Sequence, residues 1–262
     1  KDTFLDVPLE TKYSLYNKWI YGDPNKGLYT VTVLRYLEEK RIGGQTDFDA
    51  EQDRGNNELY GQLVDFQQPE LISKASFKFN QVHAIKFESG FSYHNQESYY
   101  GTTHYDADQY NFNINIAHVL SWRSHKLTSG LNLNRIKINE EINFNDNYNK
   151  SQTGTQKNEK VPGLFFENNF NWNSGNAQII TGLSIDKHNE FGFLINPRGL
   201  IKYNFSENTI IRLSLGSGWR TFNLFSEHSH LLASNKNIII EENLKPEKAI
   251  NYGLNLLQAF YF

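Results

Sequence analysis

Apolar and polar residues alternate along about eleven stretches of this chain, with the period of two that predicts β-strands. The clearest stretch places Tyr110, Phe112, Ile114 and Ile116 on one face and three asparagines on the other. The other stretches centre on residues 12–21, 29–33, 71–79, 85–93, 127–133, 164–172, 179–185, 201–205, 211–215 and 250–256. The pattern therefore predicts an all-β, antiparallel protein.

Short and long polar connections join these expected strands in strict rotation. The short ones fall near Gly22–Gly27, Asn80–Val82, Trp122–Ser124, Asn173–Asn176 and Ser206–Asn208. The long ones fall near Glu38–Pro69, His94–Asp108, Asn139–Lys160, Lys187–Asn196 and Trp219–Lys248. A soluble sandwich has no reason to place all its long loops at one end, whereas a transmembrane β-barrel has short periplasmic turns and long extracellular loops. The asymmetry favours a barrel.

Aromatic residues gather beside the short turns. They include Trp19, Tyr21, Phe77, Phe79, Trp122, Phe170, Trp172, Tyr203 and Phe205. Membrane barrels carry such rings as girdles at the membrane–water boundary. Aromatic residues in a sandwich core are the alternative, but their repetition at most short turns favours the girdle. An odd number of strands is unusual for a single-chain barrel, so we expect residues 1–262 to form one segment, about half of a larger barrel.

Composition narrows the function classes. The net charge is −3, so no basic field is present to attract nucleic acid. Cysteine and methionine are absent, which leaves no disulfide, thiol nucleophile or initiating methionine. No run approaches the roughly eighteen apolar residues of a membrane helix. We expect a processed product or a piece of a longer protein.

The first long connection is acidic. Alternating carboxylates at Asp47, Asp49, Glu51 and Asp53, followed by Glu58, are similar to an EF-hand calcium loop. Gln52 stands where that loop requires glycine for its sharp turn. A solvated acidic loop is the favoured interpretation.

The second long connection is rich in histidine, tyrosine and aspartate. We select six residues as candidate ligand contacts: His94, Tyr99, Tyr100, His104, Tyr105 and Asp106; Asp108 lies beside them. Imidazole and carboxylate groups can bind a transition metal, and tyrosines can stack on a sugar. Packing among neighbouring loops is the favoured alternative. His228 and His230 beside Glu227 are a weaker ligand pair, and His188 is interpreted as a polar loop residue.

Enzyme motifs are not found. The sequence has no His-Glu-x-x-His, no Gly-x-Ser-x-Gly and no phosphate-binding glycine loop, and Leu215 stands where a hydrolase elbow around Ser217 needs glycine. We expect neither an enzyme nor a cofactor, and we assign no catalytic, cofactor or metal residues.

Two segments resemble a known family. NPRGLIKYNF at 196–205 leads into NTIIRLSLGSGWRTFN at 208–223, and ENLKPEKAINYG follows at 242–253. They resemble the barrel region of TonB-dependent outer-membrane receptors, although Phe222 stands where that family commonly has proline. TFLDVPL at 3–9, GGQ at 43–45 and EKVPG at 159–163 are similar to the Bacteroidetes type. The matching motif residues, for which we expect structural roles, are Pro197, Arg198, Arg212, Gly216, Gly218, Arg220, Asn223, Pro246 and Glu247.

The resemblance implies a bacterial outer-membrane protein whose barrel has about twenty-two strands around an N-terminal plug. It implies uptake of a siderophore, cobalamin, metal complex or glycan, driven through a TonB complex. The partners would be that ligand, outer-membrane lipid, the plug and TonB, and not nucleic acid. No plug or TonB box is visible in residues 1–262, and we expect the final strands of the parent barrel to lie outside them. Two rival interpretations are a surface barrel such as an adhesin and a soluble β-sandwich acting on carbohydrate.

Overall fold

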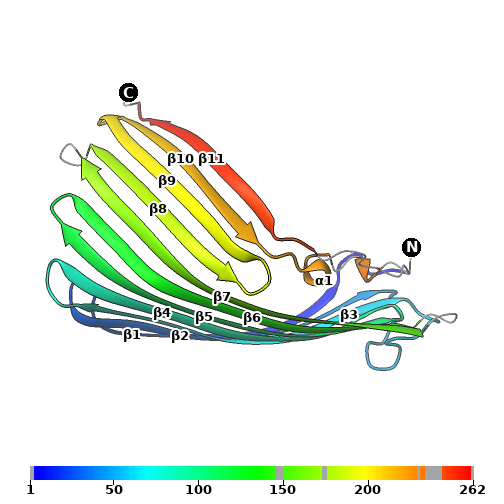
Figure 1. Ribbon diagram of the computed structural model, residues 1–262. Helices are drawn as coiled ribbons and strands as arrows, with labels where there is room; N and C mark the ends of the chain where they lie inside the picture. Colours follow the sequence, from blue (N-terminus) through cyan, green and yellow to red (C-terminus); the bar gives the residue numbers. More distant parts are fainter. Residues whose placement is uncertain (1–2, 146–149, 173–175, 229–230, 234–243, 261–262) are drawn as a thin grey trace.

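The computed structural model describes residues 3–145, 150–172, 176–228, 231–233 and 244–260 (Figure 1). These residues form one antiparallel sheet of eleven strands, each paired with the next along the chain. The strands are β1 (Leu9–Asp23), β2 (Lys26–Gly44), β3 (Gly61–Lys78), β4 (His83–Tyr100), β5 (Thr103–Trp122), β6 (His125–Asn145), β7 (Lys150–Trp172), β8 (Ala177–His188), β9 (Gly192–Ser206), β10 (Thr209–Arg220) and β11 (Glu247–Gln258). The all-β antiparallel prediction is confirmed.

The sheet curves into an incomplete barrel. Strands β1 to β6 form the floor of the view in Figure 1, and β7 to β11 rise from it, so that the sheet has a convex outer face and a concave inner face. β1 and β11 lie at opposite ends of the strand order and do not pair with each other. One short helix, α1 (Leu224–Glu227), lies in the connection between β10 and β11. Within the described residues no helix has the length and apolar character needed to cross a membrane.

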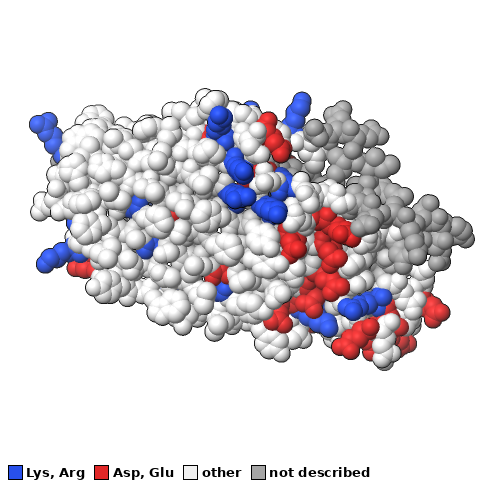
Figure 2. All heavy atoms as spheres, turned by 60° about the horizontal axis from the view of Figure 1, so that its bottom comes forward, with Lys and Arg blue, Asp and Glu red and all other residues white. Residues whose placement is uncertain are grey.

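The strand register separates the two faces cleanly. On β5 the outward positions from Tyr110 to Leu120 include Phe112, Ile114 and Ile116, and none is Asp, Glu, Lys or Arg. The outward positions are equally free of these residues over 85–93 of β4, 125–133 of β6, 162–172 of β7, 177–185 of β8 and 193–205 of β9. Figure 2 shows this broad uncharged surface. A band of about 9–11 residues per strand matches the span that a tilted transmembrane β-strand requires.

The short connections lie where the sequence predicts them. They comprise residues 24–25, 79–82, 123–124 and 207–208, and we call this side the turn end. The fifth predicted short connection, Asn173–Asn176, falls largely on residues 173–175, which lie outside the described ones. The opposite side, the loop end, carries 45–60, 101–102, 146–149, 189–191 and 221–246. Only the first and last of these five are long. The expected loops at His94–Asp108, Asn139–Lys160 and Lys187–Asn196 are corrected to strand extensions joined by brief connections.

The error has a physical cause. Beyond the uncharged band the outward row becomes polar or charged, and the apolar residues that remain, such as Ile138, Ile142 and Phe144 of β6, lie on the inner face. The row of outward apolar residues therefore stops while backbone pairing continues. β4 and β5 remain paired as far as Tyr100 and Thr103, and Gly101 closes their hairpin with φ of 59°. β6 and β7 remain paired as far as Asn145 and Lys150. Period-two analysis detects the part of a strand next to lipid and misses the part above it.

Strand heights at the loop end are unequal. β7 has 23 residues but β8 has 12, and they pair only from Gly163 to Trp172 of β7. Asn189, just after β8, covers part of the unpaired edge of β7: its side-chain Oδ1 accepts from the Lys160 amide at 2.8 Å, and its Nδ2 donates to the Asn158 carbonyl at 2.9 Å. At the loop end, the shorter β8–β9 hairpin therefore stops before the tall strands β4 to β7 do.

Candidate functional site

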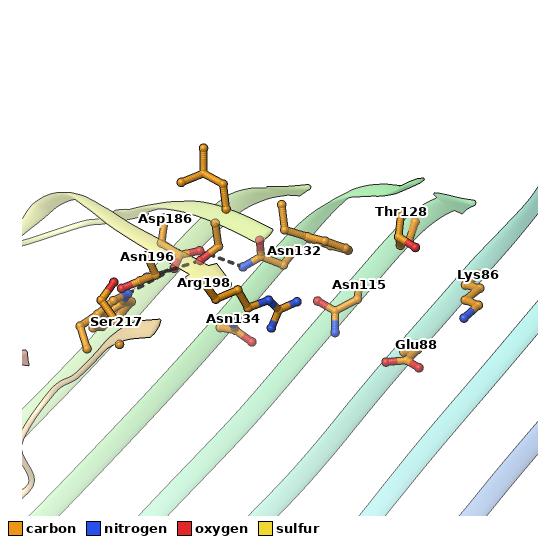
Figure 3. Close-up of a pocket in the computed structure, with 16 residues that line it drawn as sticks. Lys86, Glu88, Asn115, Thr128, Asn132, Asn134, Asp186, Asn196, Arg198 and Ser217 are labelled. Carbon is orange, nitrogen blue, oxygen red and sulfur yellow. Dashed lines mark hydrogen bonds between the residues drawn. The ribbon is translucent and has the colours of Figure 1, made fainter. Parts of the chain in front are cut away.

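A polar cavity of about 800 Å³ lies on the inner face (Figure 3). The residues labelled in Figure 3 come from six strands, because inward positions alternate with the outward apolar ones. They are Lys86 and Glu88 on β4, Asn115 on β5, Thr128, Asn132 and Asn134 on β6, Asp186 on β8, Asn196 and Arg198 on β9, and Ser217 on β10. Six of these ten side chains are amides or hydroxyls, and the other four are two cations and two carboxylates.

Asp186 is the centre of hydrogen bonding in this cavity. Its carboxylate accepts from Nδ2 of Asn132 at 3.3 Å and from Nδ2 of Asn196 at 3.4 Å. A third donor is the indole Nε1 of Trp219, at 3.2 Å. Asp186 is nearly buried, so these donors replace the water that an isolated carboxylate would need. The network links β6, β8, β9 and β10.

Trp219 reaches this carboxylate because β10 leaves its neighbour. The β9–β10 pairing ends at Gly216 opposite Arg198, although β9 continues toward Gly192. Beyond Gly216 the strand stays paired with β11 as far as Arg220 opposite Glu247. Gly216 and Gly218 therefore lie where β10 separates from β9.

The other motif residues lie near this separation. Pro197 lies within β9 opposite Leu183, and not at the start of the strand. Its missing N–H is tolerated where the ladder to β10 stops. Arg220 pairs with Glu247 at 2.7 Å and with Glu227 at 3.0 Å, and Pro246 directly precedes β11. Arg198 pairs with Glu167, and Arg212 lies opposite Lys202.

The connection after β10 folds onto the inner face at the loop end. Phe225 and Leu232 are buried against a cluster from β4 to β6 that contains Tyr100, Tyr105, Ala107, Ile142 and Phe144. Lys157 of β7 donates to the Phe222 carbonyl at 3.2 Å, and the Thr221 hydroxyl donates to Glu159 at 3.0 Å. This small apolar core fixes α1 inside the curve of the sheet.

Beside α1 is a second inner cavity of about 180 Å³. It contains His94 and Tyr105, two of the predicted ligand contacts, together with Asn223. Nδ1 of His94 lies 2.9 Å from Oε1 of Gln68, and Nε2 lies 3.2 Å from Oε1 of Gln96. The Tyr105 hydroxyl donates to the buried Glu140 at 2.8 Å, and burial followed by that carboxylate raises the Tyr105 pKa.

The six predicted contacts are divided between the two faces of the sheet. His94, Tyr100 and Tyr105 point inward, while Tyr99, His104 and Asp106 point outward on the same hairpin. Because successive residues of a strand alternate in direction, neighbours in sequence cannot form one site. The sequence places them together in a loop, and the extended strands separate them.

The outward group forms a cluster of its own. Nε2 of His104 lies 3.4 Å from Oε1 of Glu97 and 3.3 Å from Oδ2 of Asp106, and the His104 ring stacks on Tyr99 at 4.4 Å. Donor atoms of Glu97, His104 and Asp106 all lie within 4.8 Å of one another. Burial and the neighbouring carboxylates raise the Asp106 pKa, although His104 opposes the shift.

The acidic loop uses its carboxylates on its own backbone. Oδ1 of Asp49 accepts from the amides of Glu51 at 2.8 Å and Gln52 at 3.2 Å, and Asp53 accepts from the Asp49 amide at 2.9 Å. These are local turn contacts of the kind Asp makes in loops. They agree with the favoured interpretation of a solvated loop.

His188 differs from its predicted role as a polar loop residue. It is buried, and its Nδ1 accepts from the amides of Glu190 at 3.0 Å and Phe191 at 3.3 Å. Its Nε2 lies 3.6 Å from Glu159. The alternation Ser184, Asp186, His188 on one face of β8 is the signal that predicts both inward residues. His228 follows α1 with its ring 5.5 Å from that of Phe222, and His230 lies outside the described residues.

The uncharged outer band and the amide-rich inner face define the class: a segment of a transmembrane antiparallel β-barrel with a polar lumen. Residues 3–262 match the family model described as TonB dependent receptor-like, beta-barrel, and the chain belongs to that family. No match was found among curated proteins.

Solved structures with this fold are distant in sequence. The ferric citrate transporter FecA in its unliganded form gives a TM-score of 0.69 at 12% identity, over 96% of this chain and 41% of FecA. P. aeruginosa FpvA bound to heterologous pyoverdines gives 0.68 at 12%, over 94% and 39%. The siderophore receptor PiuA from Acinetobacter baumannii gives 0.65 at 12%, over 96% and 48%. The chain thus spans less than half the length of these structures.

Proposed function

We propose that this chain forms part of the wall of an outer-membrane TonB-dependent receptor that takes up a scarce nutrient without chemical turnover. The opposite character of its two faces is the observation that carries the proposal. An outer face free of Asp, Glu, Lys and Arg over a membrane-sized band suits lipid, and the amide-rich inner face suits contact with a polar plug. Membership of the receptor family supports the same placement.

The partners follow from that placement. The plug would contact the inner cavity around Asp186, and a TonB complex would supply energy to the assembled receptor. The nutrient classes in this proposal are a siderophore, a cobalamin, a metal complex or a glycan. The Bacteroidetes lineage is proposed from the sequence motifs at 3–9, 43–45 and 159–163.

We assign ligand contact at the loop end to the inner cavity beside α1. His94 is the sharpest candidate among the six predicted residues, because it faces that cavity and presents its ring between the amides of Gln68 and Gln96. Tyr105 faces the same cavity, and its hydroxyl donates to Glu140. The outward Tyr99, His104 and Asp106 point away from the path of a ligand moving through the barrel.

The test uses the full-length receptor in cells and a labelled nutrient of each class. Uptake should require TonB, and His94→Ala should weaken ligand binding about tenfold through loss of one polar contact. His104→Ala is the control, because it removes the same residue type from the outer face of the same hairpin, nearer its tip. Uptake that persists without TonB would contradict the transport proposal. An equal loss of ligand binding in His94→Ala and His104→Ala would contradict the assignment of His94 as a ligand contact.

A further inference from the structure

Cations mark the loop-end limit of the uncharged outer band on three consecutive strands. On β6, β7 and β8, the first outward-facing position on the loop-end side of the band is occupied by Arg135, Lys160 and Lys187, respectively. Lys137 is the next outward position on β6. Figure 2 shows basic side chains gathered where the uncharged surface ends.

These four cations have no carboxylate partner. Among the described side chains, no ion pair involves any of them. Arg135 lies directly opposite Lys160, an arrangement of like charges that destabilises a sheet. Lys187 lies over the ring of Phe193, 5.8 Å from its centroid, which holds it against the apolar surface. An external anion bound near Arg135 and Lys160 would remove the repulsion between these two cations.

The cations are confined to one sector of the outer face. On β3 to β6 the outward row farther toward the loop end is acidic: Asp65, Glu97, Asp106 and Glu141 lie opposite one another across these strands. On β4 and β5 the band ends at Tyr93 and Tyr110, followed by Asn95 and Asp108. The basic sector on β6 to β8 is therefore a local feature and not a general property of the rim.

A groove joins the basic sector to the apolar band. The cavity has a volume of about 420 Å³ and is lined by Phe91, Tyr110, Phe112, Arg135, Lys137 and Asn139. Phe112 lies directly opposite Arg135 and Tyr110 directly opposite Lys137, so that the rings of β4 and β5 form one side of the groove and the two cations of β6 form the other. A ligand that fits both parts has an anionic head and an apolar body.

We propose that Arg135, Lys137, Lys160 and Lys187 bind the phosphate groups of lipid in the outer leaflet, with the groove holding the first part of the lipid's apolar chains. The site rests on the membrane placement proposed above and is separate from the nutrient path, since it lies on the opposite face of the sheet. Arg and Lys are the side chains best suited to phosphate, through charge and through hydrogen bonds.

The effect should be large enough to measure. A basic residue next to an anionic membrane surface contributes roughly fivefold to binding, so neutralising three should cost roughly 100-fold. The test variant of the full-length receptor is Arg135→Gln, Lys137→Gln and Lys160→Gln together. The control is Lys18→Gln, Lys126→Gln and Lys202→Gln, which removes the same charge from inward positions.

Lipid binding is measured by native mass spectrometry of the detergent-purified receptor, titrated with diphosphorylated lipid A or with the same lipid after dephosphorylation. We expect wild type and control to agree within about twofold, and the test variant to bind diphosphorylated lipid at least tenfold more weakly. Dephosphorylated lipid should bind wild type as weakly as the phosphorylated lipid binds the test variant.

Three results would overturn the proposal. The first is undiminished binding in the test variant, and the second is equal binding of both lipids to wild type. The third is full displacement by inorganic phosphate, which would indicate a general anion site. Nutrient uptake is measured on the same variants, so that loss of lipid binding with retained uptake, or the reverse, assigns each failure to its own proposal.

Discussion

The two faces of β5 differ in character, although neighbouring residues on them are one position apart. Ile114 points to the convex side among Leu133 and other apolar residues, while Asn115 points into the inner cavity. The backbone hydrogen bonds around both residues belong to the same ladder. Because successive side chains point to opposite faces, a single strand borders lipid on one side and a polar lumen on the other.

The strongest way to break this comparison is a charge on the outer face. Ile114→Arg in the full-length receptor should destabilise the folded barrel by roughly 2–4 kcal/mol, because the guanidinium would lie in lipid. Denaturant titration of the receptor in lipid vesicles measures the change. Asn113→Arg and Asn115→Arg place the same charge on the inner face and should be far milder. Equal costs on both faces would remove the membrane assignment.

A smaller substitution compares how tightly side chains pack on the inner and outer faces of the sheet. A methyl group on Gly130, which faces inward, would lie 2.3 Å from the Ile116 carbonyl oxygen and 2.5 Å from the Phe165 ring. Gly130→Ala should therefore destabilise the barrel by about 1–3 kcal/mol. Gly199 faces outward with no atom within 4 Å of the added methyl, so Gly199→Ala is the control. The same denaturant titration should show it to be neutral, and a larger cost there than at Gly130 would refute the packing argument.

The smallest effect concerns charge above the membrane. Asp106 has a pKa raised above 3.8, so its charged form is disfavoured in the folded hairpin and this cost is present above the raised pKa. Protonation removes the cost as the pH falls through that value. Asp106→Asn should stabilise the β4–β5 hairpin by a few tenths of a kcal/mol at neutral pH. Hydrogen exchange near Tyr99 and His104 measures this gain, which should vanish below pH 3.8. A gain that persisted in acid would exclude titration of Asp106 as its cause.

The sequence predicts the part of this fold that borders lipid and little beyond it. Alternation identifies eleven strands and the direction of Ile114 correctly, since lipid demands apolar residues at every second position. It fails at His94 and His104, which are ten residues apart and lie on opposite faces of strands that continue beyond the lipid-facing band. It also cannot predict the contact of Phe225 with Tyr100 and Ile142, because that contact joins segments brought together only by the curvature of the sheet.

The basic sector on β6 to β8 is only partly predictable from the sequence. Arg135 and Lys160 occupy outward positions in the printed sequence, and they are visible as soon as the alternation of β6 and β7 is extended past the apolar band. That Arg135 is directly opposite Lys160 depends on the register, which is fixed by the brief connection between the strands. The residue types were available from the sequence, whereas their alignment across strands required the structure.

The unequal heights of β7 and β8 have a consequence for local stability. Along Lys150–Pro162, about 40 Å of strand at about 3.3 Å per residue, β7 has no β8 ladder and is covered by Asn189 and the segment after β10. Separating two paired strands elsewhere breaks many backbone bonds, whereas among the described residues this seam is held by side chains such as Lys157 and Thr221 and by the backbone bond from Asn189 to Lys160. The free energy of opening is therefore lowest along this line, and fluctuations of the wall should begin there.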